Sequence, residues 1–255
     1  MQLVFSRALM RVVELHRPTW RIRMTASTTH RALDGVGYRI AGDLDLSRPA
    51  TSVAQLAVGN RIHELTSGGS RLGDDVAESL DIADFDSEYA FGDGVLRFAA
   101  KTEYDPQTEL VEEPLLVVWQ GRRHSLVTRL YRQTESEIMG MLRRLGIRES
   151  AEGLSLHPDN AAGVGFAGPA TVIKEIPGLG LLEMAAPTAE QTAQLPPWKG
   201  VDVKAGELYR DTLADGKPFF VLSTPQVWAT LVPLADTVLD DVPRLADALT
   251  LHVDG

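Results

Sequence analysis

The sequence predicts an α+β fold in which antiparallel sheets carry a few flanking helices. Two observations favour this class. Strand-like segments follow one another in runs, and helical patterns stand isolated between them. A strand–turn–strand–helix order in the middle of the chain also returns in its last third. A doubly wound parallel sheet would instead alternate strands and helices throughout.

The clearest local signal is a β-hairpin over residues 114–130. Leu115–Trp119 is an apolar strand, and Ser125–Leu130 is a β-branched and apolar return strand. Between them, Gly121-Arg122 predicts a two-residue turn with glycine at the position that needs positive φ.

A helix is expected directly after this hairpin. Thr134 and Glu137 have the spacing of a capping box, and Gly146 stands where a glycine typically ends a helix. Its apolar stripe consists of Ile138, Met141, Leu142 and Leu145.

The same order is predicted again near the C-terminus. Asp215-Gly216 signals a turn, Pro218–Leu222 an apolar strand and Val227–Leu234 its return strand. Asp240 or Asp241 then caps a helix that has Pro243 in its first turn.

Similar spacings support a relation between the two regions. Pro114 and Pro218 are 104 residues apart, as are Ile138 and Val242. Gly94 lies 112 residues before Gly206, a difference that we attribute to insertions in the first half of the chain. A fainter internal repeat joins TTHRALDGVGY at Thr28–Tyr38 to SLHPDNAAGVGF at Ser155–Phe166.

We therefore predict two α+β lobes, residues 1–150 and residues 151–255, related by a pseudo-twofold axis. Such a duplication would create a seam between the lobes as a natural place for binding. An alternative stays open, because any two strand–strand–helix units resemble each other.

The remaining elements are predicted from local pattern. A helix is expected within Ala50–Leu65, although Gly59 and Asn60 are poor helix formers. Further strands are expected at Trp20–Met24, Val36–Asp45, Val95–Tyr104, Ala170–Glu175, Leu179–Ala185 and Glu207–Thr212.

Composition excludes several classes of function. The chain has no cysteine, which rules out disulfides, cysteine nucleophiles and zinc–thiolate sites. The net charge of −10 argues against nucleic-acid binding, and no apolar run is long enough to span a bilayer. The excess of arginine over lysine suggests a GC-rich, bacterial gene, and we expect a cytoplasmic location.

The first 23 residues stand apart because they are basic. They carry five arginines against Glu14, a net charge of +4, and Met24 follows them directly. Three readings stay open: a start site assigned too early, a targeting peptide, or a first element that docks on acidic surface. The interrupting Arg7 and Arg11 argue against a secretory signal.

Two short motifs match the sequence patterns of phosphate-binding or phosphate-transferring sites, but neither has the structural context that such a site requires. Gly163–Gly168 matches G-x-G-x-x-G, but Pro169 and a predicted strand follow where a helix is required. Asp43 and Asp45 have D-x-D spacing, but the preceding strand alternates and looks half exposed. A third run, Gly68–Gly73, lacks the lysine of a P-loop and is expected to be a flexible loop.

An acidic stretch covers residues 74–88. Asp84, Asp86 and Glu88 have the alternate spacing of a calcium loop, but Tyr89 replaces the required glycine. A solvated helix face or an acidic partner-binding surface is the preferred interpretation, and no base in the stretch compensates its charge.

The six histidines lack metal-ligand spacing, so no metal site, cofactor site or catalytic group is predicted. His30 and His157 occupy equivalent places in the internal repeat, and a duplication could place them across the seam. A surface or hydrogen-bonding role for each is the alternative.

The segment Pro196-Pro197-Trp198 is the best candidate for contact with a protein. A stiff proline pair that presents a tryptophan suits partner docking. The preferred interpretation of the residue itself is nevertheless that Trp198 folds back and covers a sheet edge.

The favoured function is therefore a non-enzymatic protein-binding, adaptor or chaperone-like protein, with a protein partner held by the Trp198 segment, the acidic stretch or the seam. Two alternatives stay open. One is an enzyme or small-ligand protein with its site at the seam, and the other is a homo-oligomeric assembly subunit.

Overall fold

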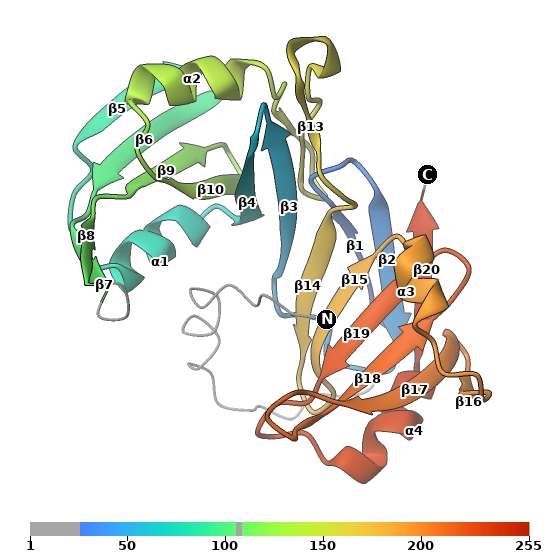
Figure 1. Ribbon diagram of the computed structural model, residues 1–255. Coiled ribbons are helices and arrows are strands. Elements are labelled where there is room, and N and C mark those ends of the chain that lie inside the picture. Colours follow the sequence, from blue (N-terminus) through green and yellow to red (C-terminus); the bar gives the residue numbers. More distant parts are fainter. Residues whose placement is uncertain (1–25, 106–108, 255) are drawn as a thin grey trace.

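The fold, known from a computed structural model that describes residues 26–105 and 109–254, consists mostly of antiparallel strands with few helices (Figure 1). All strand pairings within these residues are antiparallel, so the predicted α+β, sheet-rich class is confirmed. The predicted strand at Trp20–Met24 and the basic segment 1–23 lie outside the described residues.

One large sheet runs through the molecule. Strand β13 (Val164–Phe166) pairs with β3 beside the main path. In spatial order that path is β16 (Val201–Val203), β17 (Gly206–Thr212), β18 (Pro218–Ser223), β19 (Trp228–Val232), β15 (Gly180–Ala185), β14 (Thr171–Ile176), β3 (Ala50–Val58), β4 (Arg61–Gly69), β10 (His124–Leu130), β9 (Leu115–Gln120), β6 (Gly94–Ala100) and β5 (Ser87–Phe91).

Three smaller sheets complete the strand structure. The largest has three strands in the order β1-β2-β20, and the other two are the pairs β7-β8 and β11-β12. Their bounds are β1 (Ala26–Arg31), β2 (Gly37–Gly42), β20 (Leu249–Asp254), β7 (Glu103–Asp105), β8 (Leu110–Glu112), β11 (Arg148–Glu149) and β12 (Leu154–Ser155).

Helices are short and lie on the faces and ends of the sheets. α2 (Glu135–Arg143) begins with the predicted capping box of Thr134 and Glu137. The others are α1 (Leu72–Ser79), α3 (Ala189–Ala193), α4 (Val242–Asp247) and the 3₁₀ turns Asn160–Ala162 and Leu239–Asp241. No helix in the described part of the chain is long and apolar enough to cross a membrane.

The main core lies between the large sheet and the elements that cover one of its faces. Tyr38 of β2 and Leu249 of β20 are buried there with Leu56 of β3 and Leu182 of β15. On the opposite face α1 packs through Ala77. Figure 1 shows α1 and α2 on opposite sides of the β9–β10 hairpin.

The strands on either side of the central β3–β14 pair follow one order. From β3 outward the path runs through β4, β10, β9, β6 and β5, and from β14 outward it runs through β15, β19, β18, β17 and β16. The β3–β14 pair and the β2–β20 pair both join residues 1–150 to residues 151–255.

The helix predicted within Ala50–Leu65 is wrong, because this stretch forms the β3–β4 hairpin. Its buried side chains alternate, but two of them, Ser52 and Ala54, are polar or small and hide the period of two. Gly59 adopts φ +58° and makes the hairpin turn.

The other hairpins fall where the sequence predicts them, with one correction. The β9–β10 loop has three residues instead of two, and Gly121 does not adopt positive φ. The carboxylate of Glu149 accepts hydrogen bonds from the backbone N–H groups of Arg122, Arg123 and His124, and this holds the wider loop in place.

Candidate functional site

The segment between α3 and β16 presents the most exposed tryptophan of the described residues. Thr188 and Gln191 form a capping box that fixes the start of α3. The chain then passes through Pro196 and Pro197 to Trp198, whose exposed fraction is 68%. Trp198 therefore does not fold back over the sheet edge, and its indole is free to contact another molecule.

β16 follows directly and is the last strand of the large sheet. Within the described residues it pairs only with β17, so no strand covers the other edge of its backbone. Helix α4 contacts β16, and Asp247 of α4 accepts a hydrogen bond from the N–H of Lys204 at the end of the strand. Val201 lies opposite Leu208 of the main core and is 56% exposed, because the core ends beside it. We call Pro196–Val203 the Trp198 edge.

The other face of β16 carries like charges. Asp202 is the direct cross-strand partner of Glu207. Two carboxylates opposite each other destabilise a strand pair. Lys199 compensates in part, since its Nζ lies 2.7 Å from Asp202 Oδ2, and both side chains are largely exposed. The Tyr209 hydroxyl donates to the Glu207 carboxylate.

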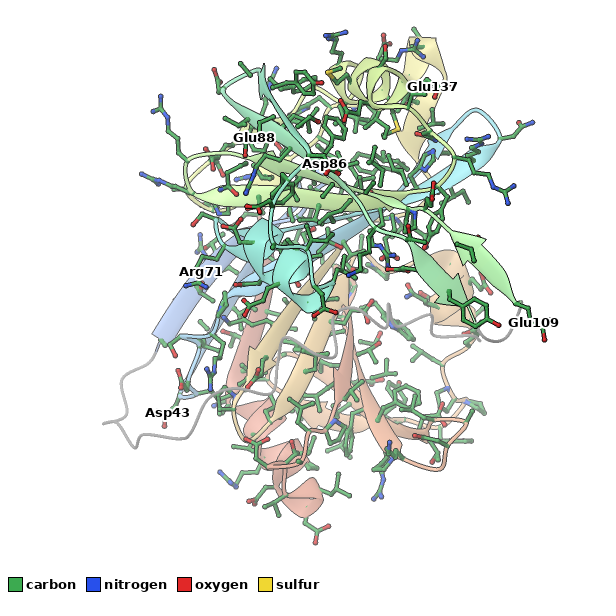
Figure 2. The ribbon with its side chains drawn as sticks, turned by 90° about the vertical axis from the view of Figure 1, so that its left-hand side faces the viewer. Asp43, Arg71, Asp86, Glu88, Glu109 and Glu137 are labelled. Atoms are coloured by element: carbon green, nitrogen blue, oxygen red, sulfur yellow. The ribbon has the colours of Figure 1, made fainter. Side chains whose placement is uncertain are left out.

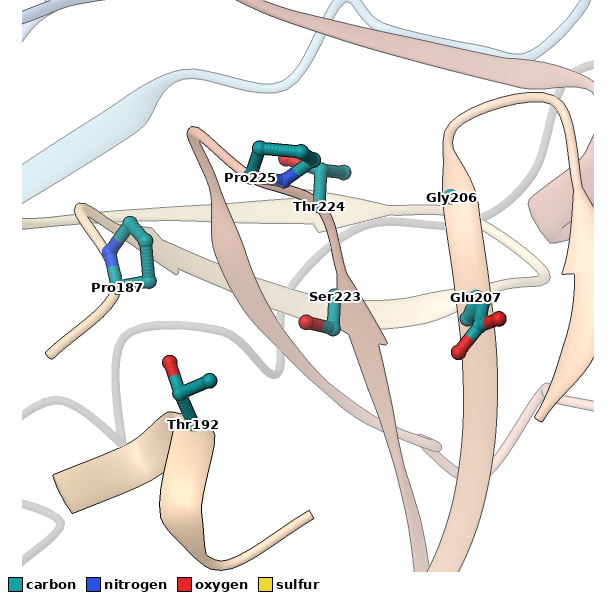
Figure 3. Close-up of a pocket in the computed structure, with 7 residues that line it drawn as sticks. All are labelled: Pro187, Thr192, Gly206, Glu207, Ser223, Thr224 and Pro225. Atoms are coloured by element: carbon teal, nitrogen blue, oxygen red, sulfur yellow. The ribbon is translucent and has the colours of Figure 1, made fainter. Parts of the chain in front are cut away.

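A shallow hollow of about 480 Å³ opens between α3, the start of β17 and the end of β18 (Figure 3). Glu207 is the one ionisable group in its lining, so a pair of groups for acid–base catalysis does not converge there. The other lining residues are Pro187, Thr192, Gly206, Ser223, Thr224 and Pro225.

Two carboxylates of the acidic stretch are paired with Arg97 of β6, a base that lies outside the stretch. The Arg97 guanidinium lies 2.7 Å from Asp74 Oδ1 and 3.0 Å from Glu88 Oε1, and it stacks 3.7 Å from the centre of the Phe85 ring. The sequence missed this base because it lies nine residues beyond Glu88 and reaches it only through the β5–β6 pairing.

Asp84, Asp86 and Glu88 do not converge on a cation. Asp86 accepts a hydrogen bond of 2.7 Å from the backbone N–H of Ala100, whereas Glu88 is tied to Arg97. Figure 2 shows Asp86 and Glu88 in one region of the molecule and Asp43 far from them. In the described ranges no group of three or more metal-ligating side chains is close enough to hold a metal ion.

The glycine-rich runs lack the geometry of phosphate loops. Gly163–Gly168 contains β13 and leads into β14, so no helix N-terminus faces it. The run Gly68–Gly73 does join strand β4 to helix α1, but Asp74 and Asp75 fill the first turn of α1, and their charges repel an anion.

The two histidines of the predicted seam lie in different surroundings. His157 is exposed, and its ring Nε2 lies 3.4 Å from the Ser155 hydroxyl. His30 lies on β1 and pairs with Tyr38, and its Nε2 is buried without a hydrogen-bond partner. Among the described residues, no hydrogen bond or ion pair joins the two rings.

His30 instead lies near two other basic side chains, His124 and Lys174. Burial, together with the neighbouring His124 and Lys174, lowers its pKa to about 4. Lys174 is 2% exposed, and its ammonium donates to the carbonyl of Arg48. Burial also lowers the pKa of Lys174. Sequence reasoning missed this cluster because its members lie on three distant strands.

The cluster makes stability depend on pH. A histidine whose pKa falls from 6.5 to about 4 on folding binds its proton more tightly in the unfolded chain. His30 therefore has no effect on stability above pH 6.5 and destabilises the fold as pH falls from 6.5 towards 4, by about 3 kcal/mol in total.

We expect His30→Gln to remove most of this loss, measured as the free energy of urea unfolding between pH 7 and pH 4. His157→Gln is the matched control, because His157 is exposed. If the free energy of unfolding of His30→Gln fell with pH as steeply as that of the unchanged chain, the pKa of His30 would not be lowered on folding.

Comparison with protein-family models, with curated proteins and with solved structures finds no match to this chain.

Proposed function

We propose that this protein is a non-enzymatic binding protein, an adaptor or a chaperone-like factor of a bacterial cytoplasm, that holds an extended segment of a protein partner at the Trp198 edge. The observation that carries the proposal is the exposure of Trp198 and Val201, 68% and 56%, beside the open backbone of β16.

The backbone of β16 supports recognition by strand addition. An unpaired edge offers a row of N–H and C=O groups that an extended peptide can satisfy. The opposite edge, β5, is better protected: the hydroxyls of Ser87 and Tyr89 both donate to Glu135 of α2. The segment before β16 has no such cover over Trp198.

The side chains support the same role. An exposed tryptophan brings a large apolar area at a low cost in conformational entropy and is a frequent centre of binding energy. Pro196 and Pro197 restrict the backbone before it, which reduces the ordering cost of binding.

Replacing Trp198 by alanine is expected to weaken partner capture by about 30-fold or more, because a central aromatic contact contributes about 2 kcal/mol or more. The assay is capture by the purified chain from an extract of its own host, with the partner mass defined by native mass spectrometry and its affinity then measured.

Tyr131→Ala is the matched control, since Tyr131 is an exposed aromatic residue elsewhere on the surface. Equal capture by Trp198→Ala and the unchanged chain would show that the Trp198 edge is not the partner site.

An enzyme or ligand-binding site at the seam is the second candidate. The buried, unpartnered Nε2 of His30 beside Lys174 favours it, because such a group can bind an anionic ligand that reaches it. Two results together would support this candidate over the first. The natural protein would release a bound small molecule on denaturation, and Trp198→Ala would leave partner capture unchanged.

A duplicated origin with pseudo-twofold lobes is part of the proposal. The matching strand order on both sides of the β3–β14 pair supports it. So does a matched pair of glycines: a Cβ on Gly94 would lie 2.5 Å from the carbonyl oxygen of Gln120, and one on Gly206 would lie 2.4 Å from that of Ser223. Each glycine begins a seven-residue strand.

A further inference from the structure

We infer that the Trp198 edge binds the segment Trp20–Met24 of a second copy of this chain, so that the protein assembles through its own basic N-terminal region. The inference rests on the proposed function of the Trp198 edge and names the occupant of that surface.

The two faces of β16 define what an added strand must carry. Val201 and Val203 share one face, where Val203 packs on the main core and Val201 is exposed. Asp202 projects on the other face, opposite Glu207. An added strand therefore gains most from apolar residues that flank a basic residue, because the basic side chain offsets the unfavourable pair of carboxylates.

The sequence Trp20-Arg21-Ile22-Arg23-Met24 has this alternation. With Arg21 beside Asp202, Trp20 and Ile22 fall on the face of the two valines. The segment lies in the basic stretch of net charge +4, whereas the rest of the chain carries −14. Charge and pattern thus both match the Trp198 edge.

We assign the segment to a second copy and not to the same chain. Strand β2 lies between β1 and β20, and α4 contacts both β20 and β16. In the same chain the segment would have to cross two strand spacings, about 10 Å, before it reached the region of α4. In a second copy the whole segment is available for pairing with β16, so the oligomeric state distinguishes the two cases.

The test measures the oligomeric state of the full chain by light scattering and sedimentation over a concentration series. We expect a concentration-dependent oligomer that the double variant Arg21→Glu/Arg23→Glu weakens at least tenfold. Arg7→Glu/Arg11→Glu is the matched control, because it changes the charge equally outside Trp20–Met24, and it should leave the association constant within about twofold.

A charge exchange then tests the contact itself. Asp202→Lys should weaken the oligomer, and Asp202→Lys together with Arg21→Glu/Arg23→Glu should restore it. Asp240→Lys, another exposed carboxylate, is the control and should have little effect. A monomer at every concentration, equal effects of both arginine pairs, or no restoration would overturn the inference.

These outcomes are separable from those of the proposed function. A chain that stays monomeric but captures a different protein in a Trp198-dependent way would retain the proposed function and overturn this inference alone. An oligomer that is unaffected by Asp202→Lys would overturn this inference, whereas partner capture that is unaffected by Trp198→Ala would overturn the proposed function.

Discussion

Replacing Phe98 by alanine is expected to lower the free energy of unfolding by about 4 kcal/mol. Phe98 lies on β6 and is 0% exposed within the main core. Its ring makes an edge-to-face contact with Tyr89 at 6.0 Å between centroids. Truncation removes the buried ring and leaves a cavity that a closely packed sheet fills only in part.

The measurement is urea unfolding followed by circular dichroism, with the free energy obtained by linear extrapolation. Tyr104→Ala serves as the control, because Tyr104 is 63% exposed and should change the free energy by no more than about 0.5 kcal/mol. Similar losses for both variants would mean that β6 is not part of the main core.

The sequence predicts most of the fold where hydropathy has a clear period. The β9–β10 hairpin and the capped helix α2 follow from a β-branched run, a glycine and a capping box, and both elements lie within residues 115–143. The β3–β4 hairpin does not follow, because the buried face of β3 carries Ser52. The Ser52 hydroxyl oxygen accepts a hydrogen bond from Leu33, and this satisfies a polar side chain in the core.

Some features of the candidate site can likewise be predicted from the sequence, and others cannot. Proline and tryptophan in one short loop identify Trp198 from sequence, since the feature is local. The open edge of β16 is not local, because it depends on which strand ends the large sheet. The cluster of His30, His124 and Lys174 is also out of reach, since three strands far apart in sequence bring it together.

Pairing across strands also explains why the base beside the acidic stretch is not visible in the sequence. Counted along the chain, residues 74–88 lack a base, but antiparallel pairing places Arg97 opposite Glu88. Charge balance on a sheet is set by cross-strand neighbours, so a local count of charges misses it. The acidic stretch is thereby a weaker candidate for partner binding than the Trp198 edge.

Replacing Gly206 by alanine is expected to cost about 3 kcal/mol, the second large effect. Gly206 adopts φ +142°, which L residues rarely adopt, and its new Cβ would lie 2.4 Å from the carbonyl oxygen of Ser223. The backbone strain and the overlap add, because Ser223 is held by the β17–β18 pairing and cannot move away freely.

Gly216→Ala separates the two causes. Gly216 also has positive φ, +84°, but a Cβ there would meet no atom within 4 Å, so only the strain of about 1 kcal/mol remains. Equal costs at Gly206 and Gly216 would show that the strand end yields to the new methyl group.

Gly94→Ala extends the experiment to the proposed duplication. Gly94 has no positive φ, but its Cβ would meet the carbonyl oxygen of Gln120 at 2.5 Å. If β6 and β17 descend from one strand, both kept the close contact between their first glycine and the carbonyl oxygen of the neighbouring strand, while the φ angles of the two glycines diverged. We expect Gly94→Ala to cost about 2 kcal/mol, since it lacks the strain but keeps the overlap. A neutral substitution at Gly94 would remove this pair from the support for pseudo-twofold lobes.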